Sequence, residues 1–218
     1  MKIFAKGRSP RDAFPMSTPN QSGEEVSFAS NPGRIALAHE KLRALRPDLY
    51  GVRGVWKSLL ASIRGGRLLR DFVAEQLRLG DSRAAVAIST TPLLIAAYTD
   101  ELDCIAMLRL PHELVERFGL SAGSRLLTVN YYGDAPNYDP DLILGPNRDQ
   151  HWTGFHPLIA DFLTDDHARV EDRKHEIAEA EWRRAHALGV EYARLRPGVA
   201  RDGRPGYASY PALVLFGP

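Results

Sequence analysis

Three short apolar runs follow one another in the middle of the chain. They cover residues 84–89, 93–99 and 104–110, and turn-forming or polar residues separate them. Runs of this length predict strands, and connections this short cannot hold crossovers, so the strands should be mostly antiparallel. Residues 124–131 repeat the pattern and predict a fourth strand. We expect the turn at 100–103, which carries three carboxylates, to be exposed.

Helical periodicity precedes these strands. Apolar residues recur at helical spacing over 33–46, directly after an Asn-Pro pair that can cap and begin a helix, and Pro47 ends the pattern. Two further helices are predicted within 50–79. Gly65 and Gly66 mark the break between them, because paired glycines weaken a helix interior.

Helices are also predicted after the first strands. A short one covers 111–118, and Gly119 is placed to end it in the left-handed conformation. A second is predicted at 157–163. Residues 165–196 carry one long apolar stripe at helical spacing, which we interpret as two consecutive helices with a break near Ala178.

The order of these elements predicts the fold class. It indicates an α+β fold with a helical N-terminal part, a small mostly antiparallel sheet, and C-terminal helices packed on the sheet. Residues 1–32 contain few large apolar side chains, so we expect a flexible tail or a strap on the surface. Residues 33–218 are predicted to form a single domain.

Composition narrows the class of protein. The chain has 218 residues, of which 44% are hydrophobic and 25% charged, as in ordinary globular proteins. No apolar run is long enough to span a membrane, and the first residues lack the apolar core of a signal peptide, so we expect a cytoplasmic protein with no membrane partner. A single cysteine, Cys104, permits no internal disulfide and no zinc ribbon. No cofactor is indicated.

Residues 119–123 read GLSAG and match the GxSxG pattern of hydrolase nucleophiles. That pattern requires a strand before the serine and a helix after it. Here the predicted order is the reverse, so we interpret the two glycines as a helix cap and a turn.

The same region also resembles a family of DNA-binding proteins. Residues 107–127 include a proline before a short helix, then Gly-Leu-Ser-Ala-Gly before a strand, and this arrangement resembles the core of swapped-hairpin, AbrB-type proteins. The resemblance implies a DNA-binding regulator. The family carries a Gly-Arg pair just upstream of the proline, where this chain has Ala106 and Met107, so the basic residues that would touch DNA are absent there.

Charge is balanced over the whole chain but not along it. The net charge is +1 overall, whereas residues 34–83 are strongly basic and residues 134–172 strongly acidic. Arg53, Lys57 and Arg64 would lie along one side of a helix. They could bind phosphates or an acidic partner, or they could pair with the acidic middle of the same chain. A pI of about 7.9 does not favour nucleic acid as a partner in general.

The segment 130–156 is the most informative candidate site. It has little periodicity, and irregular segments this long inside a compact domain are usually functional or disordered; its aromatic residues argue against disorder. Its candidate ligand-binding residues are Asp134, Asn137, Tyr138, Asp139, Asp141, His151, Trp152 and His156.

Two chemical interpretations of this segment are possible. Asn137, Asp139 and Asp141 have the oxygen spacing of a calcium loop, but the required glycine is missing, and the two histidines could bind zinc or iron beside a carboxylate. Alternatively, the polar residues form turns and the aromatic ones anchor the segment to the core. No motif passes its context test, so we expect a non-catalytic binding or interaction protein, whose partner is another protein or a small ligand. A metal-dependent or hydrolytic enzyme using this segment, and a DNA-binding regulator, are the alternatives.

Overall fold

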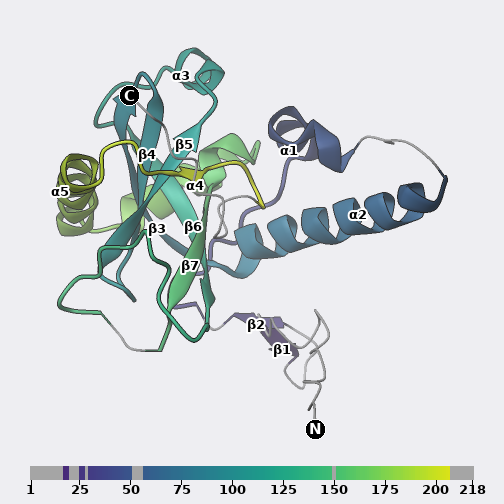
Figure 1. Ribbon diagram of the computed structural model, residues 1–218, viewed down its shortest axis with the longest axis horizontal. Coiled ribbons are helices and arrows are strands. Elements are labelled where there is room, and N and C mark those ends of the chain that lie inside the picture. Colours follow the sequence, from purple (N-terminus) through teal and green to yellow (C-terminus); the bar gives the residue numbers. More distant parts are fainter. Residues whose placement is uncertain (1–16, 20–24, 28, 51–55, 149–150, 207–218) are drawn as a thin grey trace, which may run out of the picture.

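A curled six-stranded sheet forms the centre of the molecule (Figure 1). The computed structural model describes residues 17–19, 25–27, 29–50, 56–148 and 151–206, with the backbone alone for 17–19, 25–27 and 56–64. The helices are α1 (His39–Leu45), α2 (Trp56–Leu79), α3 (Glu113–Phe118), α4 (His167–Glu176) and α5 (Glu179–Leu195), with the 3-10 helices η2 (Pro47–Leu49) and η3 (Ala160–Phe162). The strands of the sheet are β3 (Asp81–Thr90), β4 (Leu93–Thr99), β5 (Cys104–Leu110), β6 (Arg125–Gly133), β7 (Gly154–Ile159) and β8 (Arg201–Asp202). A separate two-stranded pair consists of β1 (Ser17–Pro19) and β2 (Glu25–Ser27).

The strand order is β7-β6-β3-β4-β5-β8, and only the pairing of β5 with β8 is parallel. The four strands predicted from the apolar runs are therefore confirmed, as is the α+β class with helices after the sheet. Two further strands, β7 and β8, extend the sheet at its two edges. The prediction of a mostly antiparallel sheet also holds.

The sheet curls until its two edges meet. Directly paired residues of neighbouring strands point to the same face of a sheet, as do every second residues along one strand. Arg83 pairs with Thr128, and Tyr132, four residues further along β6, pairs with Phe155, so all four side chains share one face. On that inner face, the Arg201 guanidinium of β8 donates a hydrogen bond of 2.7 Å to the Phe155 carbonyl of β7. The inner face is thus nearly enclosed by its own strands.

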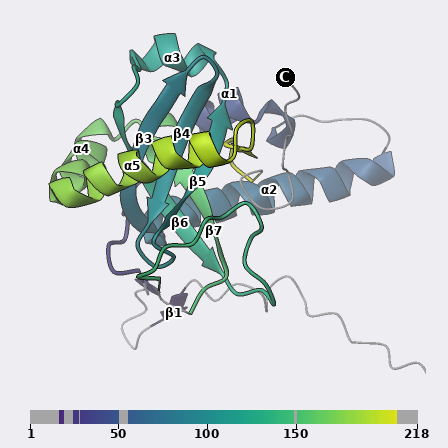
Figure 2. The same cartoon turned by 60° about the vertical axis from the view of Figure 1, so that its left-hand side comes forward.

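Helices cover the outer face in two places. Helix α5 lies across β3, β4 and β5 (Figure 2), where Trp182, Ala185 and Tyr192 pack against the strands. The C-terminal half of α2 covers β6 and β7, where the Gln76 amide donates to the carbonyls of Val129 (3.0 Å) and His156 (2.6 Å).

The first predicted helix begins later than expected. Residues 33–35 are not helical, because the backbone N–H groups of Gly33, Arg34 and Ile35 donate to carbonyls at the end of α2 and just beyond it. The helix itself starts at His39, and it ends as predicted before Pro47. The predicted helix start at the Asn-Pro pair is therefore wrong, because these N–H groups form tertiary hydrogen bonds with the end of α2 instead of taking part in a local helix.

The predicted break at Gly65 and Gly66 is also wrong. Helix α2 is continuous from Trp56 to Leu79 and is drawn as one straight rod (Figure 1). A Cβ atom at Gly66 would lie 2.8 Å from the Leu49 carbonyl oxygen, so the glycine lets η2 approach the helix. The glycines serve close packing here, and they do not end the helix.

Residues 157–163 were predicted as a helix but form the end of β7, then η3 and the residue after it. Short apolar runs do not distinguish a buried strand from a helix, and here pairing with β6 decided. The break near Ala178 is confirmed, because α4 ends at Glu176 and α5 begins at Glu179. The short helix ending at Gly119 is confirmed too, with Gly119 at a φ of 60°.

The turn between β4 and β5 differs from expectation in two residues. Asp100 and Glu101 are partly exposed, as a turn would suggest, but Leu102 and Asp103 are buried. The Arg184 guanidinium of α5 donates to both Asp103 carboxylate oxygens, at 3.0 to 3.2 Å. Asp103 therefore ties the turn to α5.

Candidate functional site

The predicted segment 130–156 wraps around the closing edges of the sheet. Asp139 and Asp141 turn inward, and both bind the Arg201 guanidinium at 2.7 to 3.0 Å. Arg201 is only 3% exposed and Asp141 only 2%. Gly154 makes room for this, because a Cβ atom there would lie 2.5 Å from an Asp139 carboxylate oxygen.

The charges of this cluster hold Arg201 in its ionised form. Burial alone lowers the pKa of Arg201, but the hydrogen bond and charge of Asp141 and the charge of Asp139 outweigh it and raise the pKa. The calcium-like spacing of the two aspartates is thus explained without a metal, since their carboxylates surround a guanidinium from their own chain. We name Arg201, Asp139 and Asp141 the closing cluster.

The other predicted residues of this segment lie apart from the closing cluster. Asp134, Asn137, Tyr138 and His151 are exposed. The Trp152 ring stacks on Tyr132, with ring centroids 5.9 Å apart, and the His156 ring stacks on Tyr131 at 6.2 Å. The structure therefore brings together two of the eight predicted residues, and it uses two aromatic ones to anchor the segment. Among the described residues, no three His, Cys, Asp or Glu side chains are placed to hold a metal ion.

The basic stripe predicted on the second helix lies outside the described side chains. Arg53 is outside the described residues altogether, and for Lys57 and Arg64 only the backbone is described. One contact elsewhere does join the basic and acidic parts of the chain. Lys41 of α1 forms an ion pair of 3.1 Å with Asp165.

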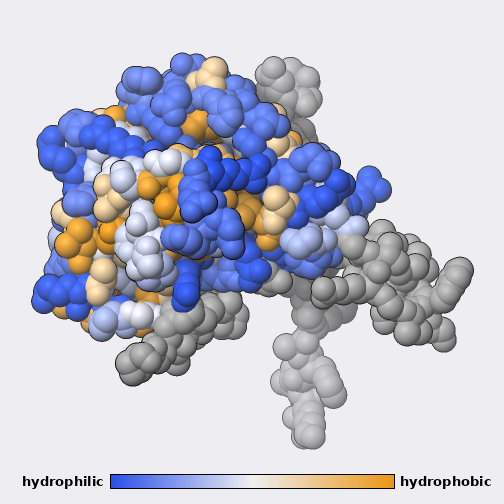
Figure 3. Space-filling model, turned by 90° about the horizontal axis from the view of Figure 1, so that it is seen from above, coloured by the Kyte–Doolittle hydropathy of each residue, from blue (hydrophilic) through white to orange (hydrophobic). Residues whose placement is uncertain are grey.

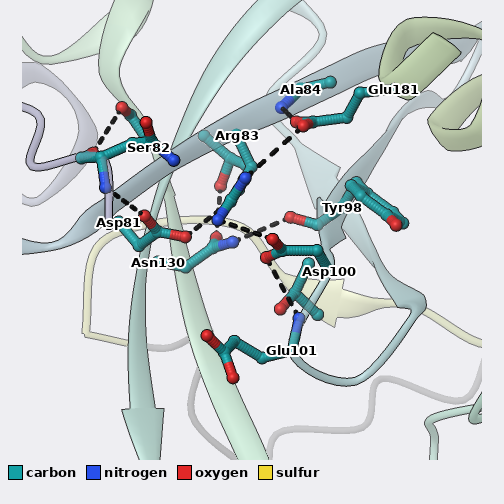
Figure 4. A network of polar contacts seen from close by, with 12 residues as sticks. Asp81, Ser82, Arg83, Ala84, Tyr98, Asp100, Glu101, Asn130 and Glu181 are labelled. Carbon is teal, nitrogen blue, oxygen red and sulfur yellow. Dashed lines mark hydrogen bonds and ion pairs between the residues drawn. The ribbon is translucent and has the colours of Figure 1, made fainter. Parts of the chain in front are cut away.

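A second polar cluster fills a fork between β3 and β4 (Figure 4). The ladder between these strands ends at Ala85 and Ala97. Beyond it, the Glu181 carboxylate accepts the Ala84 N–H at 2.8 Å, and the Asn130 amide donates to the Tyr98 carbonyl at 2.8 Å. Side chains thus replace the ladder hydrogen bonds where the strands separate.

Arg83 stands in the middle of this fork. Its guanidinium contacts Asp81 at 2.6 Å, Asp100 at 2.7 Å and Glu181 at 3.6 Å. Burial raises the pKa of Asp81 and of Glu181, although Arg83 opposes this. Burial lowers the pKa of Arg83, but its three carboxylate partners outweigh that effect and raise it. The cluster anchors the start of α5 to the sheet.

An open groove lies at the other end of α5. Its volume is about 740 Å³, which is within the range of small-molecule sites. The turn after β3, the strands β4 and β5 and the chain after α5 form its walls. Its lining residues are Thr91, Pro92, Leu94, Met107, Arg109, His112, Ala193, Arg196, Pro197, Gly198, Val199 and Ala200.

The groove combines apolar walls with cationic groups. Leu94, Met107 and Val199 belong to or pack against the core under α5. The Arg196 guanidinium donates to the Pro140 carbonyl at 2.8 Å, and a His112 ring nitrogen lies 3.0 Å from the Thr90 carbonyl. These two contacts fix the orientation of both side chains in the groove wall. None of the described residues that line the groove is acidic.

A smaller hollow of about 400 Å³ lies beside this groove. The two share Pro92, Arg109 and His112, so they meet at these residues. The second hollow is more polar, since Glu113, Asp202 and Arg204 also line it. Seen from above the molecule in Figure 1, hydrophobic residues gather in patches among hydrophilic ones, mainly on the side of α5 (Figure 3).

Sequence reasoning missed Arg201 and the groove. Arg201 stands in a Gly- and Pro-rich stretch without periodicity, so nothing local marks it as the partner of Asp139 and Asp141. Arg109 gave one signal, as the single charged residue in the apolar run 104–110. The remaining lining residues come from three distant segments, which only the fold brings together.

Comparisons of the chain with protein-family models, curated proteins and solved structures found no match. No helix in the described part of the chain has the length and the apolar character needed to cross a bilayer.

Proposed function

We propose that the protein is a non-catalytic binding protein whose groove takes a small amphipathic anion. The observation that carries this proposal is the composition of the groove wall. Leu94, Met107 and Val199 supply an apolar surface, and Arg109 and Arg196 supply positive charge, with no carboxylate among the described lining residues. Such a wall suits a carboxylate or sulfonate with an apolar chain or ring.

The polar clusters support binding over catalysis. In the closing cluster, both carboxylates are engaged by the buried Arg201, and in the fork Arg83 holds three carboxylates together. These contacts join the segment between β6 and β7 to β8, and α5 to the sheet, so they stabilise the fold. A catalytic carboxylate must instead face a substrate within about 3 Å.

We place the protein in the cytoplasm as part of the same proposal. Cys104 is a buried free thiol, and burial raises its pKa, which makes it unreactive. A free thiol of this kind suits a reducing compartment.

Fluorescence titration with 8-anilinonaphthalene-1-sulfonate tests the proposal. We expect a Kd of about 10–100 µM for an anion of this size. N-phenyl-1-naphthylamine, which has the same rings without the sulfonate, should bind at least about tenfold more weakly, because it makes no charge-assisted contact with the arginines.

Two pairs of variants locate the site. Ala193→Trp should fill the groove and abolish binding, whereas Ala187→Trp, on the exposed side of the same helix, should leave it unchanged. Arg196→Gln should weaken binding of the sulfonate about tenfold, and Arg194→Gln, which lies outside the groove lining, should not. Equal binding of the sulfonate by Ala193→Trp and Ala187→Trp would refute the proposal.

A further inference from the structure

One side of α2 is apolar in both halves of the helix. In the C-terminal half, Val73 and Leu77 are 1% and 0% exposed, and Gly66 is buried beside η2. Leu59 stands about five turns before Leu77, and Ile63 about one turn before Gly66, so both positions lie on that same side of the helix. The side of α2 that packs on the body therefore continues, still apolar, into the N-terminal half.

The first turns of α2 extend beyond every other described element in both views of the ribbon (Figures 1 and 2). A helix in a protein gains most of its stability from the packing of its apolar side, and large apolar surfaces left in water are rare. The side that carries Leu59 and Ile63 therefore calls for an occupant that is not among the described elements.

The last described residue lies beside the point where the body stops covering α2. This residue is Gly206, and a Cβ atom there would be 2.7 Å from a Leu69 methyl carbon. The Arg46 guanidinium donates to the Pro205 carbonyl and pairs with Asp48 at 2.8 Å, so this part of the chain is tied to η2. Whatever follows Gly206 starts next to the extended turns of α2.

We propose that the C-terminal segment 207–218, which lies outside the described residues, docks on the side of α2 that carries Leu59 and Ile63. The segment contains no charged residue, and its positions 212–216 read ALVLF. Leu59 precedes Leu69 by a distance of about 15 Å along the helix axis. The chain from Gly206 to the start of the apolar run can span up to about 20 Å. The run is thus long enough to reach Leu59 and apolar enough to cover it.

Attachment to the same chain favours this segment over a second copy of the protein. A short tether keeps the apolar run beside α2 at an effective concentration on the order of 1 mM, far above that of a separate molecule in dilute solution. The inference is also independent of the groove ligand, because no residue of α2 is among the described residues that line the groove.

Labelling of introduced cysteines with N-ethylmaleimide in the full chain, followed by mass spectrometry, tests the proposal. The one native cysteine, Cys104, is buried and gives a low background. Leu59→Cys should react at least about tenfold more slowly than Leu68→Cys, because a covered thiol reacts only through local opening. Leu68 is the matched control, because it lies on the opposite side of α2 and is 68% exposed.

Charges placed in the apolar run should remove this protection. Leu213→Asp combined with Leu215→Asp should raise the labelling rate of Leu59→Cys at least about fivefold, because a carboxylate is costly to bury against an apolar surface. The matched pair Ala208→Asp with Ser209→Asp adds the same charges before the run and should change the rate by less than about twofold.

Three results would overturn the proposal. The first is equal labelling of Leu59→Cys and Leu68→Cys in the chain with its native C-terminal segment. The second is protection of Leu59→Cys that the charged apolar run leaves unchanged. The third is protection that disappears on dilution, which would assign this side of α2 to a second copy.

A reciprocal variant tests the same contact without altering the C-terminal segment. Leu59→Asp should speed the cleavage of residues 212–216 by chymotrypsin at least about fivefold, because an undocked segment is open to the protease more of the time. Leu68→Asp should not change the cleavage rate. Equal cleavage in the two variants would contradict the docking.

Discussion

Replacing Arg201 by methionine should destabilise the protein strongly. Methionine has a similar length and fits a buried site, but it removes the only guanidinium that contacts Asp139 and Asp141 among the described residues. Asp141 would be left as a buried charge without a counterion, and the Phe155 carbonyl would lose its hydrogen bond from β8.

The magnitude follows from the burial of the pair. Removing one partner of a fully buried ion pair costs about 3–5 kcal/mol, because the remaining charge is desolvated. Globular domains are stable by about 5–15 kcal/mol, so the loss is a large fraction of the total. With a urea dependence of about 2 kcal/mol per molar, the unfolding midpoint should fall by about 2 M.

Urea unfolding followed by circular dichroism measures this loss. Arg204→Met is the matched control, because Arg204 and Asp202 are more exposed and their pair should contribute less than about 1 kcal/mol. The double variant Arg201→Met with Asp141→Leu should recover at least half of the loss, since no charge is then buried at Asp141. A loss below about 1 kcal/mol for Arg201→Met would refute the role of the closing cluster.

Two further predictions concern other parts of the fold. Burial raises the pKa of Glu181, so the contribution of this side chain to stability is present at low pH and is lost as pH rises through its folded-state pKa. The Glu181→Gln variant should therefore gain stability relative to the wild type as pH rises from about 4 to about 7, measured by urea titrations. A stability difference that stays constant with pH would contradict this. A Cβ atom at Gly189 would lie 2.5 Å from Ile88 and 2.6 Å from Ala96, so Gly189→Ala should push α5 off the sheet and cost about 1–3 kcal/mol in thermal unfolding. Gly65→Ala, which would meet no atom within 4 Å, should instead stabilise α2 by up to about 1 kcal/mol, and the reasoning fails if both alanines act alike.

Elements with a strong local signal were predicted well. The strands β3, β4 and β5 follow from apolar runs bounded by turn residues, and Gly119 ends α3 because few other residues tolerate its left-handed conformation. The errors fall where a distant contact overrides the local preference. Residues 33–35 are not helical because the end of α2 and the residue after it supply their hydrogen-bond acceptors, and Gly66 lies within a helix because η2 packs against it.

In the candidate site too, local sequence patterns could be predicted and distant contacts could not. The sequence marked Asp139 and Asp141 as candidate ligand-binding residues, because with Asn137 they have the oxygen spacing of a calcium loop. It could not supply their partner. Arg201 lies 60 positions away from Asp141 and reaches it only because β8 pairs with β5 at the far edge of the sheet.

The sequence by itself determined the strands β3 to β6, the short helix α3 and the break between α4 and α5, because backbone preference and hydrophobic periodicity act over a few neighbouring residues. It also determined the α+β class. Only the tertiary structure decided that the sheet curls until Arg201 reaches Phe155, that Asp103 is buried, and that a cationic groove opens beside Ala193. These features depend on which distant surfaces pack together, and the free energy of that packing depends on several segments of the chain at once.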